Sequence, residues 1–235
     1  MKKIILISIS SFFAVLLALS CINYEQEVTL NPDGSGVAKI HYWMQTGSDT
    51  GDIKAPVKEE DIKEEYGKVE GVKVSEIKVE DKEGNTHVYF TLNFDNLKAF
   101  LNTELGGLDK EASYFKEKEG KYDFLGVVKG SAEEGAEEMD DFTKSMLGEY
   151  KFTYLFHFPG KVLETNGEID EKDPKTVRWE YSLAEISSKP KLEMKASVEK
   201  AGIGLNITLI IIIVVVIIII IIVVILLAAR GSKKE

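Results

Sequence analysis

The chain has 235 residues, a formal net charge of −10 and a single cysteine. Residues 22–200 contain 24 basic and 38 acidic side chains, a net charge of −14. This balance argues against a nucleic-acid-binding protein, because that class needs cations to neutralise phosphates. One cysteine also excludes a disulfide-stapled domain and a cysteine-based zinc site. The length of this segment suits one domain with its own hydrophobic core.

Residues 1–20 have the pattern of a secretory signal peptide. Lys2 and Lys3 precede an apolar run from Ile4 to Leu19, and small residues lead to Cys21. This order is typical of signal peptides. A cysteine just after a small residue resembles the bacterial lipobox, in which the thiol receives diacylglycerol. We therefore predict lipid attachment at Cys21. The alternatives are a cleaved signal with an incidental cysteine and an uncleaved N-terminal helix.

Residues 203–229 form the second predicted membrane segment, a transmembrane helix. Leu209 to Ala229 is an unbroken run of 21 apolar residues. As a helix it is about 31 Å long, which matches the roughly 30 Å hydrocarbon core of a bilayer. No polar side chain interrupts the run, so we predict an anchor rather than a transport path. The basic residues of the tail at 230–235 place that tail in the cytoplasm and residues 21–200 outside the membrane.

Residues 21–200 are predicted to form a single extracytoplasmic α+β domain with antiparallel sheet and two to three helices. The first half alternates apolar and polar residues on either side of turn-forming residues, as β-hairpins do. The predicted elements there are strands 22–31 and 38–44, a helix at 56–66, strands 72–79 (with a bulge) and 88–94, and a helix from Asp95 or Asn96 to Gly106.

The second half begins with two short predicted strands at 112–118 and 121–128. Ser131-Ala-Glu-Glu134 has the pattern of a capping box, so a helix is predicted at 132–147. The many carboxylates of this helix favour a solvated face over a calcium site, because no Asp-x-Asp loop is present. The remaining predicted elements are strand 150–158, a hairpin turn at Asn166-Gly167, strand 176–181 and strand 192–198.

Catalytic and metal-binding motifs are missing from the sequence. His41, His87 and His157 each fall within a predicted strand, and no two have a spacing typical of metal ligands. No nucleophile elbow, phosphate-binding loop or His-Glu-x-x-His motif occurs. We therefore expect no cofactor, no metal site and no enzymatic activity.

Alternate residues of the strand at 150–158 form an aromatic stripe. The first interpretation is core packing of a sheet beneath the helices. The second is that the sheet and the helix at 132–147 enclose an apolar, ligand-binding cavity. The candidate lining residues for such a cavity are Met139, Phe142, Met146, Phe152, Tyr154 and Phe156.

Two stretches of the domain resemble a known family. Phe156-His-Phe-Pro-Gly-Lys-Val-Leu-Glu-Thr-Asn-Gly167, followed by Thr176-Val-Arg-Trp-Glu-Tyr-Ser-Leu183, is similar to the hallmark of the bacterial LppM-type lipoprotein domain. The segment from Tyr24 to Gly36 resembles that family's opening strand and turn. The resemblance implies an α+β extracytoplasmic domain, for which binding of lipid or glycolipid in the envelope is expected.

The sequence is compatible with two functions. The first is a membrane-anchored lipoprotein that binds or handles an envelope lipid or glycolipid. The second is a non-catalytic structural or adaptor protein that binds a protein partner of unknown identity. Both place the chain at the lipid bilayer, and neither involves nucleic acid.

The lipid anchor is directly testable. Replacing the thiol that accepts the lipid (Cys21→Ser) is expected to abolish incorporation of radiolabelled palmitate into the protein. Immunoprecipitation and autoradiography measure the label. Continued labelling of the variant would contradict lipid attachment at this residue.

Overall fold

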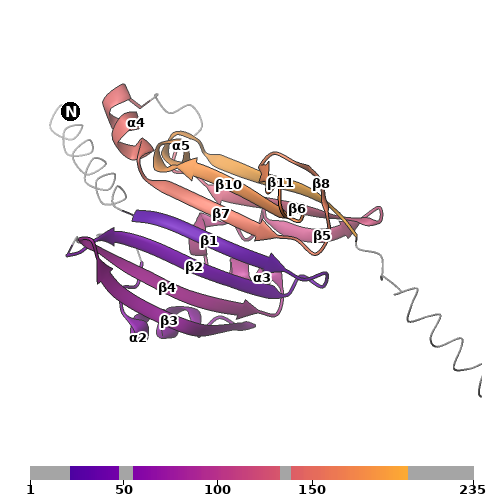
Figure 1. Cartoon of the computed structure of the whole chain (residues 1–235), viewed down its shortest axis with the longest axis horizontal. Helices are drawn as coiled ribbons and strands as arrows, with labels where there is room; N and C mark the ends of the chain where they lie inside the picture. The colour runs from indigo at the N-terminus through magenta and orange to yellow at the C-terminus, as the bar shows by residue number, and fades with distance from the viewer. Residues whose placement is uncertain (1–21, 48–54, 133–138, 201–235) are drawn as a thin grey trace, which may run out of the picture. The chain divides into compact units, whose positions relative to one another are not determined.

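The computed structural model describes residues 22–47, 55–132 and 139–200, which form one compact unit (Figure 1). The predicted signal peptide, Cys21, the predicted membrane segment at 203–229 and the tail lie outside these residues. Within the described part, no helix is long and apolar enough to cross a membrane.

Two sheets form the framework of the domain. The seven-stranded sheet has the order β3-β4-β2-β1-β7-β10-β9, and the four-stranded sheet has the order β5-β6-β11-β8. The strands of the first sheet are β1 (Ile22–Leu30), β2 (Gly36–Gln45), β3 (Val72–Lys82), β4 (Asn85–Phe94), β7 (Lys151–His157), β9 (Glu168–Ile169) and β10 (Thr176–Ser182). Those of the second are β5 (Tyr114–Lys118), β6 (Lys121–Lys129), β8 (Val162–Thr165) and β11 (Lys191–Glu199).

The described residues contain four α-helices, where two to three were predicted for the domain. They are α2 (Glu59–Tyr66), α3 (Leu97–Leu101), α4 (Asp141–Gly148) and α5 (Leu183–Ser188), and a 3-10 turn follows α3 at Leu105–Gly107. Asn96 caps α3, as one of the two predicted caps, because its side chain accepts from Ala99 N at 2.9 Å. The α+β class is confirmed.

One face of the seven-stranded sheet forms the wall of the hydrophobic core. Alternate residues of β1 and β2 are buried and the others are at least partly exposed, as period-two strands require. On the buried face, Tyr66 of α2 stacks on Phe90, Phe100 of α3 contacts Phe94, and Phe124 of the four-stranded sheet contacts Phe156. Helices α2 and α3 and the second sheet therefore share one face, and no element of the described residues covers the opposite face, called the open face below.

Four local predictions are confirmed, namely three β-hairpins and one β-bulge. The β1–β2, β3–β4 and β5–β6 hairpins pair antiparallel, and β3 carries the predicted bulge, where the register shifts between Ser75 and Lys78. Pro56, however, precedes α2 rather than opening it, because the helix begins at Glu59.

Three other predictions are wrong. The seven-stranded sheet is mixed, because β1 and β7 pair in parallel. The predicted hairpin at Asn166-Gly167 is instead a crossing from one sheet to the other: β8 pairs with β11, whereas β9 pairs with β10. Of the predicted helix at 132–147, Ala132, Met139 and Asp140 are not helical, residues 133–138 lie outside the described residues, and α4 begins at Asp141, capped by the Asp140 side chain at 3.0 Å from Thr143 N.

Asn166 connects the two sheets at this crossing. Its Oδ1 accepts from Trp179 Nε1 at 2.9 Å, on β10, and from Lys195 N at 2.7 Å, on β11. Its Nδ2 donates to Glu193 O at 2.7 Å. The Asn-Gly pair thus acts as an inter-sheet connector, and Gly167 is required because a Cβ there would lie 2.6 Å from the Trp179 ring.

Gly167→Ala is expected to lower the free energy of unfolding of the 22–200 domain by about 1–3 kcal/mol, the usual range for overpacking a core. Urea denaturation followed by circular dichroism measures the loss. Gly148→Ala is the matched control, since a Cβ at that position would have nothing within 4 Å. Equal stability of the two variants would contradict the connector role.

Candidate functional site

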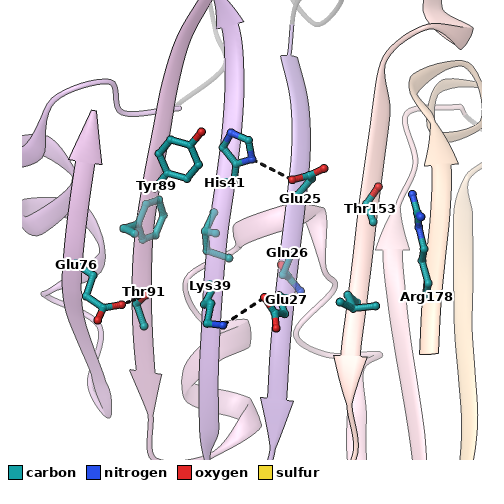
Figure 2. Close-up of a pocket in the computed structure, with 13 residues that line it drawn as sticks. Glu25, Gln26, Glu27, Lys39, His41, Glu76, Tyr89, Thr91, Thr153 and Arg178 are labelled. Atoms are coloured by element: carbon teal, nitrogen blue, oxygen red, sulfur yellow. Dashed lines mark hydrogen bonds and ion pairs between the residues drawn. The ribbon is translucent and has the colours of Figure 1, made fainter. Parts of the chain in front are cut away.

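The open face of the seven-stranded sheet carries a groove of about 530 Å³, within the range of small-molecule sites (Figure 2). It crosses strands β4, β2, β1 and β7 and ends at β10. Its lining side chains are mostly polar. They include Glu25, Glu27, Lys39, His41, Glu76, Tyr89, Thr91, Thr153, Leu155 and Arg178.

Strand register positions the charged residues in the centre of the groove. Glu25 pairs with His41 across β1 and β2, and Glu27 pairs with Lys39. The Glu25 carboxylate lies 3.0 Å from His41 Nδ1, and Lys39 Nζ lies 3.4 Å from Glu27. These pairs are solvent-exposed, so they contribute little to stability, and their hydrogen-bonding groups remain accessible from the groove.

A cluster of four rings, named the ring cluster here, borders the groove on β2 and β4. It consists of His41, Trp43, His87 and Tyr89. The His41 ring stacks on Tyr89 at 4.1 Å between centroids and on Trp43 at 4.6 Å. His41 Nε2 lies 3.1 Å from His87 Nδ1, so the two imidazoles share a hydrogen bond. Stacking and this bond fix the orientation of all four rings.

Both ends of the groove also carry hydrogen-bonding groups. At one end, Glu76 accepts from Thr91 Oγ1 at 2.8 Å. At the other, Arg178 forms an ion pair with Glu180. Beside the ring cluster, a hydrogen bond from Lys78 lowers the pKa of Glu80, which keeps that carboxylate charged. The groove therefore offers carboxylate acceptors, cationic donors and an aromatic edge within one ligand-sized space.

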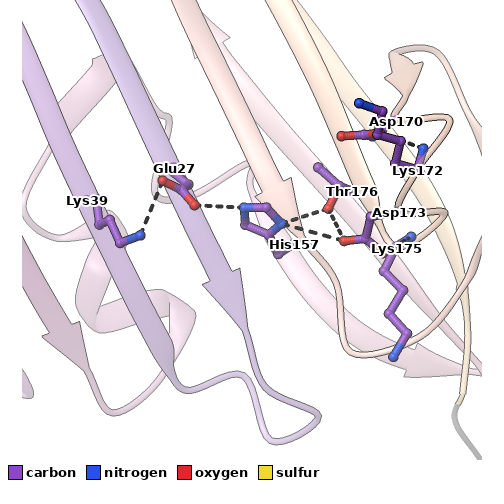
Figure 3. Close-up of polar contacts among 8 residues, drawn as sticks. All are labelled: Glu27, Lys39, His157, Asp170, Lys172, Asp173, Lys175 and Thr176. Atoms are coloured by element: carbon purple, nitrogen blue, oxygen red, sulfur yellow. Dashed lines mark hydrogen bonds and ion pairs between the residues drawn. The ribbon is translucent and has the colours of Figure 1, made fainter.

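A second polar cluster lies on the same face, centred on His157 (Figure 3). His157 Nδ1 lies 2.7 Å from Thr176 Oγ1, and Nε2 lies 3.0 Å from Glu27. Thr176 Oγ1 in turn donates to Asp173 at 2.6 Å. All three contacts are hydrogen bonds at once only when both ring nitrogens carry a proton, because carboxylates accept and do not donate.

This hydroxyl–imidazole–carboxylate order resembles a nucleophilic triad, but its geometry favours a structural role. Thr176 is only 2% exposed, and its hydroxyl oxygen also lies within hydrogen-bond distance of Asp173, at 2.6 Å. A nucleophile must reach a substrate carbon and pass its proton to the base. The His157 cluster therefore joins β1, β7 and the segment before β10.

The six predicted cavity-lining residues are not brought together. Phe142 is 76% exposed on α4, Met139 and Met146 are half-buried, and α4 packs against α5. Tyr154 and Phe156 are buried in the core, and Phe152 is half-buried against Tyr24. The aromatic stripe thus follows the core-packing interpretation. Neither the groove nor a second pocket, beside Asn166, is lined by any of the six.

The second pocket, of about 580 Å³, lies beside the inter-sheet connector and is lined by Asn166, Gly167, Arg178, Tyr181 and Glu193 among others. Its asparagine and tryptophan are already satisfied by their mutual hydrogen bond. No group of three metal-ligating side chains occurs in the part of the chain that the structure describes.

The alternation of side chains predicted for the strands correctly places the groove residues on the face of the sheet that points away from the core. What sequence reasoning missed is their convergence. His41 and His87 are 46 residues apart, and they meet because β2 pairs with β4. Only a covarying pair of positions in related sequences would have indicated that pairing.

The fold is an α+β domain with two packed sheets, one of which leaves a polar, grooved face open. The model of the LppM domain family matches residues 23–200. The chain therefore belongs to the LppM domain family, which is a lipoprotein-type family. No curated protein matches the chain. Among solved structures, the NMR structure of the folded domain of the Mycobacterium tuberculosis LppM protein is similar, with 16% identity and a TM-score of 0.47; the match covers 78% of this chain and 92% of that chain.

The His157 cluster makes the stability of the domain pH-dependent through Asp173. Hydrogen bonds from the Thr176 side chain and the Lys175 backbone lower the pKa of this carboxyl group. A lowered folded-state pKa adds stability above the unfolded value of about 3.9, and this stability is lost as the pH falls through the folded value.

Asp173→Asn is therefore expected to destabilise the 22–200 domain at pH 7 and to cost progressively less below about pH 4. Urea denaturation at pH 7, 5 and 3.5 measures the difference from wild type. Glu171→Gln, at an exposed neighbouring position, serves as the control. A difference for Asp173→Asn that stays constant with pH would rule out the carboxylate as its cause.

Proposed function

We propose that the chain is a membrane-anchored extracytoplasmic lipoprotein that binds the polar headgroup of an envelope lipid or glycolipid in the open-face groove. Anchoring is through Cys21 and the segment at 203–229, and the function is binding rather than catalysis. The groove replaces the helix-bounded cavity as the binding site, because the candidate residues of that cavity lie apart.

The arrangement of the groove carries this proposal. Sugar and glycerol hydroxyls both donate and accept hydrogen bonds, so they need acceptors and donors side by side. Glu25 and Glu76 supply acceptors, and Lys39 and Arg178 supply cationic donors that also suit a phosphate. Tyr89, which is held by its stacking on His41, adds an aromatic edge for the carbon atoms of the headgroup.

Rigidity of the groove supports specific binding. The ring cluster is held by stacking and by the His41–His87 hydrogen bond, and Glu25 is held by His41. Side chains that are already ordered lose less entropy when a ligand binds. The adaptor alternative would use the same acidic domain surface without a defined small-molecule site.

Tyr89→Ala is expected to weaken binding of dihexanoyl phosphatidylglycerol or octyl glucoside by about tenfold, because one lost contact of roughly 1.4 kcal/mol corresponds to that factor. Titration of the detergent-solubilised full chain by its tryptophan fluorescence, to which Trp43 beside the groove contributes, measures the affinity. Tyr114→Ala is the matched control, since Tyr114 is an exposed tyrosine of β5, outside the groove lining.

Native mass spectrometry of the chain purified from membranes gives a second readout. Co-purified lipid that is retained by wild type and by Tyr114→Ala, and lost from Tyr89→Ala, supports the groove. Equal loss or equal retention of lipid in the two variants would contradict the groove as the binding site. Saturable binding of a protein partner that lipid does not affect would favour the adaptor function.

A further inference from the structure

The two ends of the described domain lie at opposite ends of its strands (Figure 1). At the start of β1, Asn23 Oδ1 accepts from Lys151 N at 3.1 Å, where β7 begins. At the end of β11, Glu199 N donates to Lys161 O at 2.7 Å, beyond the end of β7. At about 3.3 Å per residue, the length of β7 alone separates these points by roughly 20 Å.

We propose that the domain lies flat on the membrane, with its strands along the surface and the open face of the seven-stranded sheet toward the lipid headgroups. This inference rests on the proposed function in one respect: it takes Cys21 as lipid-anchored and the segment at 203–229 as membrane-spanning. It adds the orientation of the groove, which neither anchor alone specifies.

The lengths of the two tethers disfavour an upright domain. Cys21 is bonded directly to Ile22, so the start of β1 is held at the membrane with no linker. Only eight residues separate Lys200 from the apolar run at Leu209, and they span at most about 26 Å. An upright domain would stretch this linker almost fully and lose its conformational entropy. A flat domain leaves it relaxed.

The difference between the two tethers, one with a linker and one without, determines which sheet faces the bilayer. The tether without a linker enters β1, which belongs to the seven-stranded sheet. The tether with a linker leaves β11, which belongs to the four-stranded sheet, and packed sheets lie about 10 Å apart. The C-terminal linker can cover that distance and the N-terminal tether cannot. The seven-stranded sheet is therefore the one at the membrane.

Charge distribution favours its open face. Among the strand residues that point to this face, six are acidic and six are basic, which leaves 18 of the 24 basic and 32 of the 38 acidic residues to the rest of 22–200. The balanced set is Glu25, Glu27, Glu76, Glu80, Glu168 and Glu180 with Lys39, Lys73, Lys78, Lys82, Lys151 and Arg178. An anionic leaflet repels the acidic remainder more strongly than this neutral face.

The ring cluster suits the same environment. Trp43 and Tyr89 are half-exposed on this face, and tryptophan and tyrosine favour the headgroup level of a bilayer. With the open face toward the membrane, the groove opens onto the headgroups. A lipid can then place its headgroup in the groove while its acyl chains stay in the bilayer, which avoids the cost of extracting them.

Site-directed fluorescence quenching in the full-length chain tests the orientation. Thr153→Cys places a bimane probe on the open face, and Ser197→Cys places one on the outward face of β11 in the four-stranded sheet. Both positions are half-buried, and a lipidated Cys21 does not react. The chain is reconstituted in phosphatidylethanolamine–phosphatidylglycerol vesicles that contain a nitroxide-headgroup lipid.

The probe at residue 153 is expected to be quenched at least threefold more than the probe at residue 197. Equal quenching, or stronger quenching at 197, would overturn the proposal. A second variant inserts ten Gly and Ser residues between Cys21 and Ile22, which preserves the lipid anchor and frees the start of β1. The difference between the probes should then shrink, and an unchanged difference would refute the tether argument.

These outcomes are distinguishable from failure of the proposed function. Headgroup binding by the detergent-solubilised chain does not depend on orientation, so a persistent Tyr89→Ala effect with equal quenching would overturn the flat orientation alone. Release of the chain from vesicles by a high-salt wash would overturn both the anchoring and the orientation.

Discussion

The parallel pairing of β1 with β7 is the constraint on which the rest of the domain depends. It joins the first four strands, in the order β3-β4-β2-β1, to the later strands β7, β10 and β9, across a sequence separation of 128 residues at the Asn23–Lys151 contact. The groove crosses this junction, since Glu25 and Lys39 come from one side and Thr153 and Arg178 from the other. The candidate site therefore exists only after this long-range pairing has formed, and such pairings carry a large loop-closure cost.

Beneath the groove, the same junction carries a polar network within the core. Tyr24 donates to Gln26 Oε1 at 2.7 Å, and Tyr154 donates to the carbonyl of Gly106. Gly106 has a φ of +65°, and a Cβ there would lie 2.9 Å from Gln26 Oε1. Burial raises the pKa of Tyr24 well above its ordinary value, so its hydroxyl stays a donor. These two hydrogen bonds satisfy the buried hydroxyl groups of Tyr24 and Tyr154, which would be costly to leave unpaired in the core.

Local chemistry explains which parts of the structure could be predicted. Strand parity, three hairpins and the Asn96 cap depend on residues close in sequence, and they follow from the sequence alone. The capping box shows the limit of such patterns. Ser182 and Glu185 form one that begins α5 and that the sequence reasoning did not single out, whereas Ala132, directly after Ser131 of the predicted box, is not helical. The choice between them, like the β2–β4 contact that brings His41 to His87, is made by tertiary packing, which a single sequence does not display.

The interior stripe and the open face have different roles in folding. The apolar residues of β7 are needed to hold the second sheet, through Phe124 against Phe156 and Trp179. Any cavity among them would weaken the contact between the two sheets. The groove side chains do not hold the two sheets together, and their exposed ion pairs contribute little to the stability of the fold. A ligand that bridges Glu25 and Arg178 would bind only the folded chain, so by linkage it would stabilise the β1–β7 junction itself.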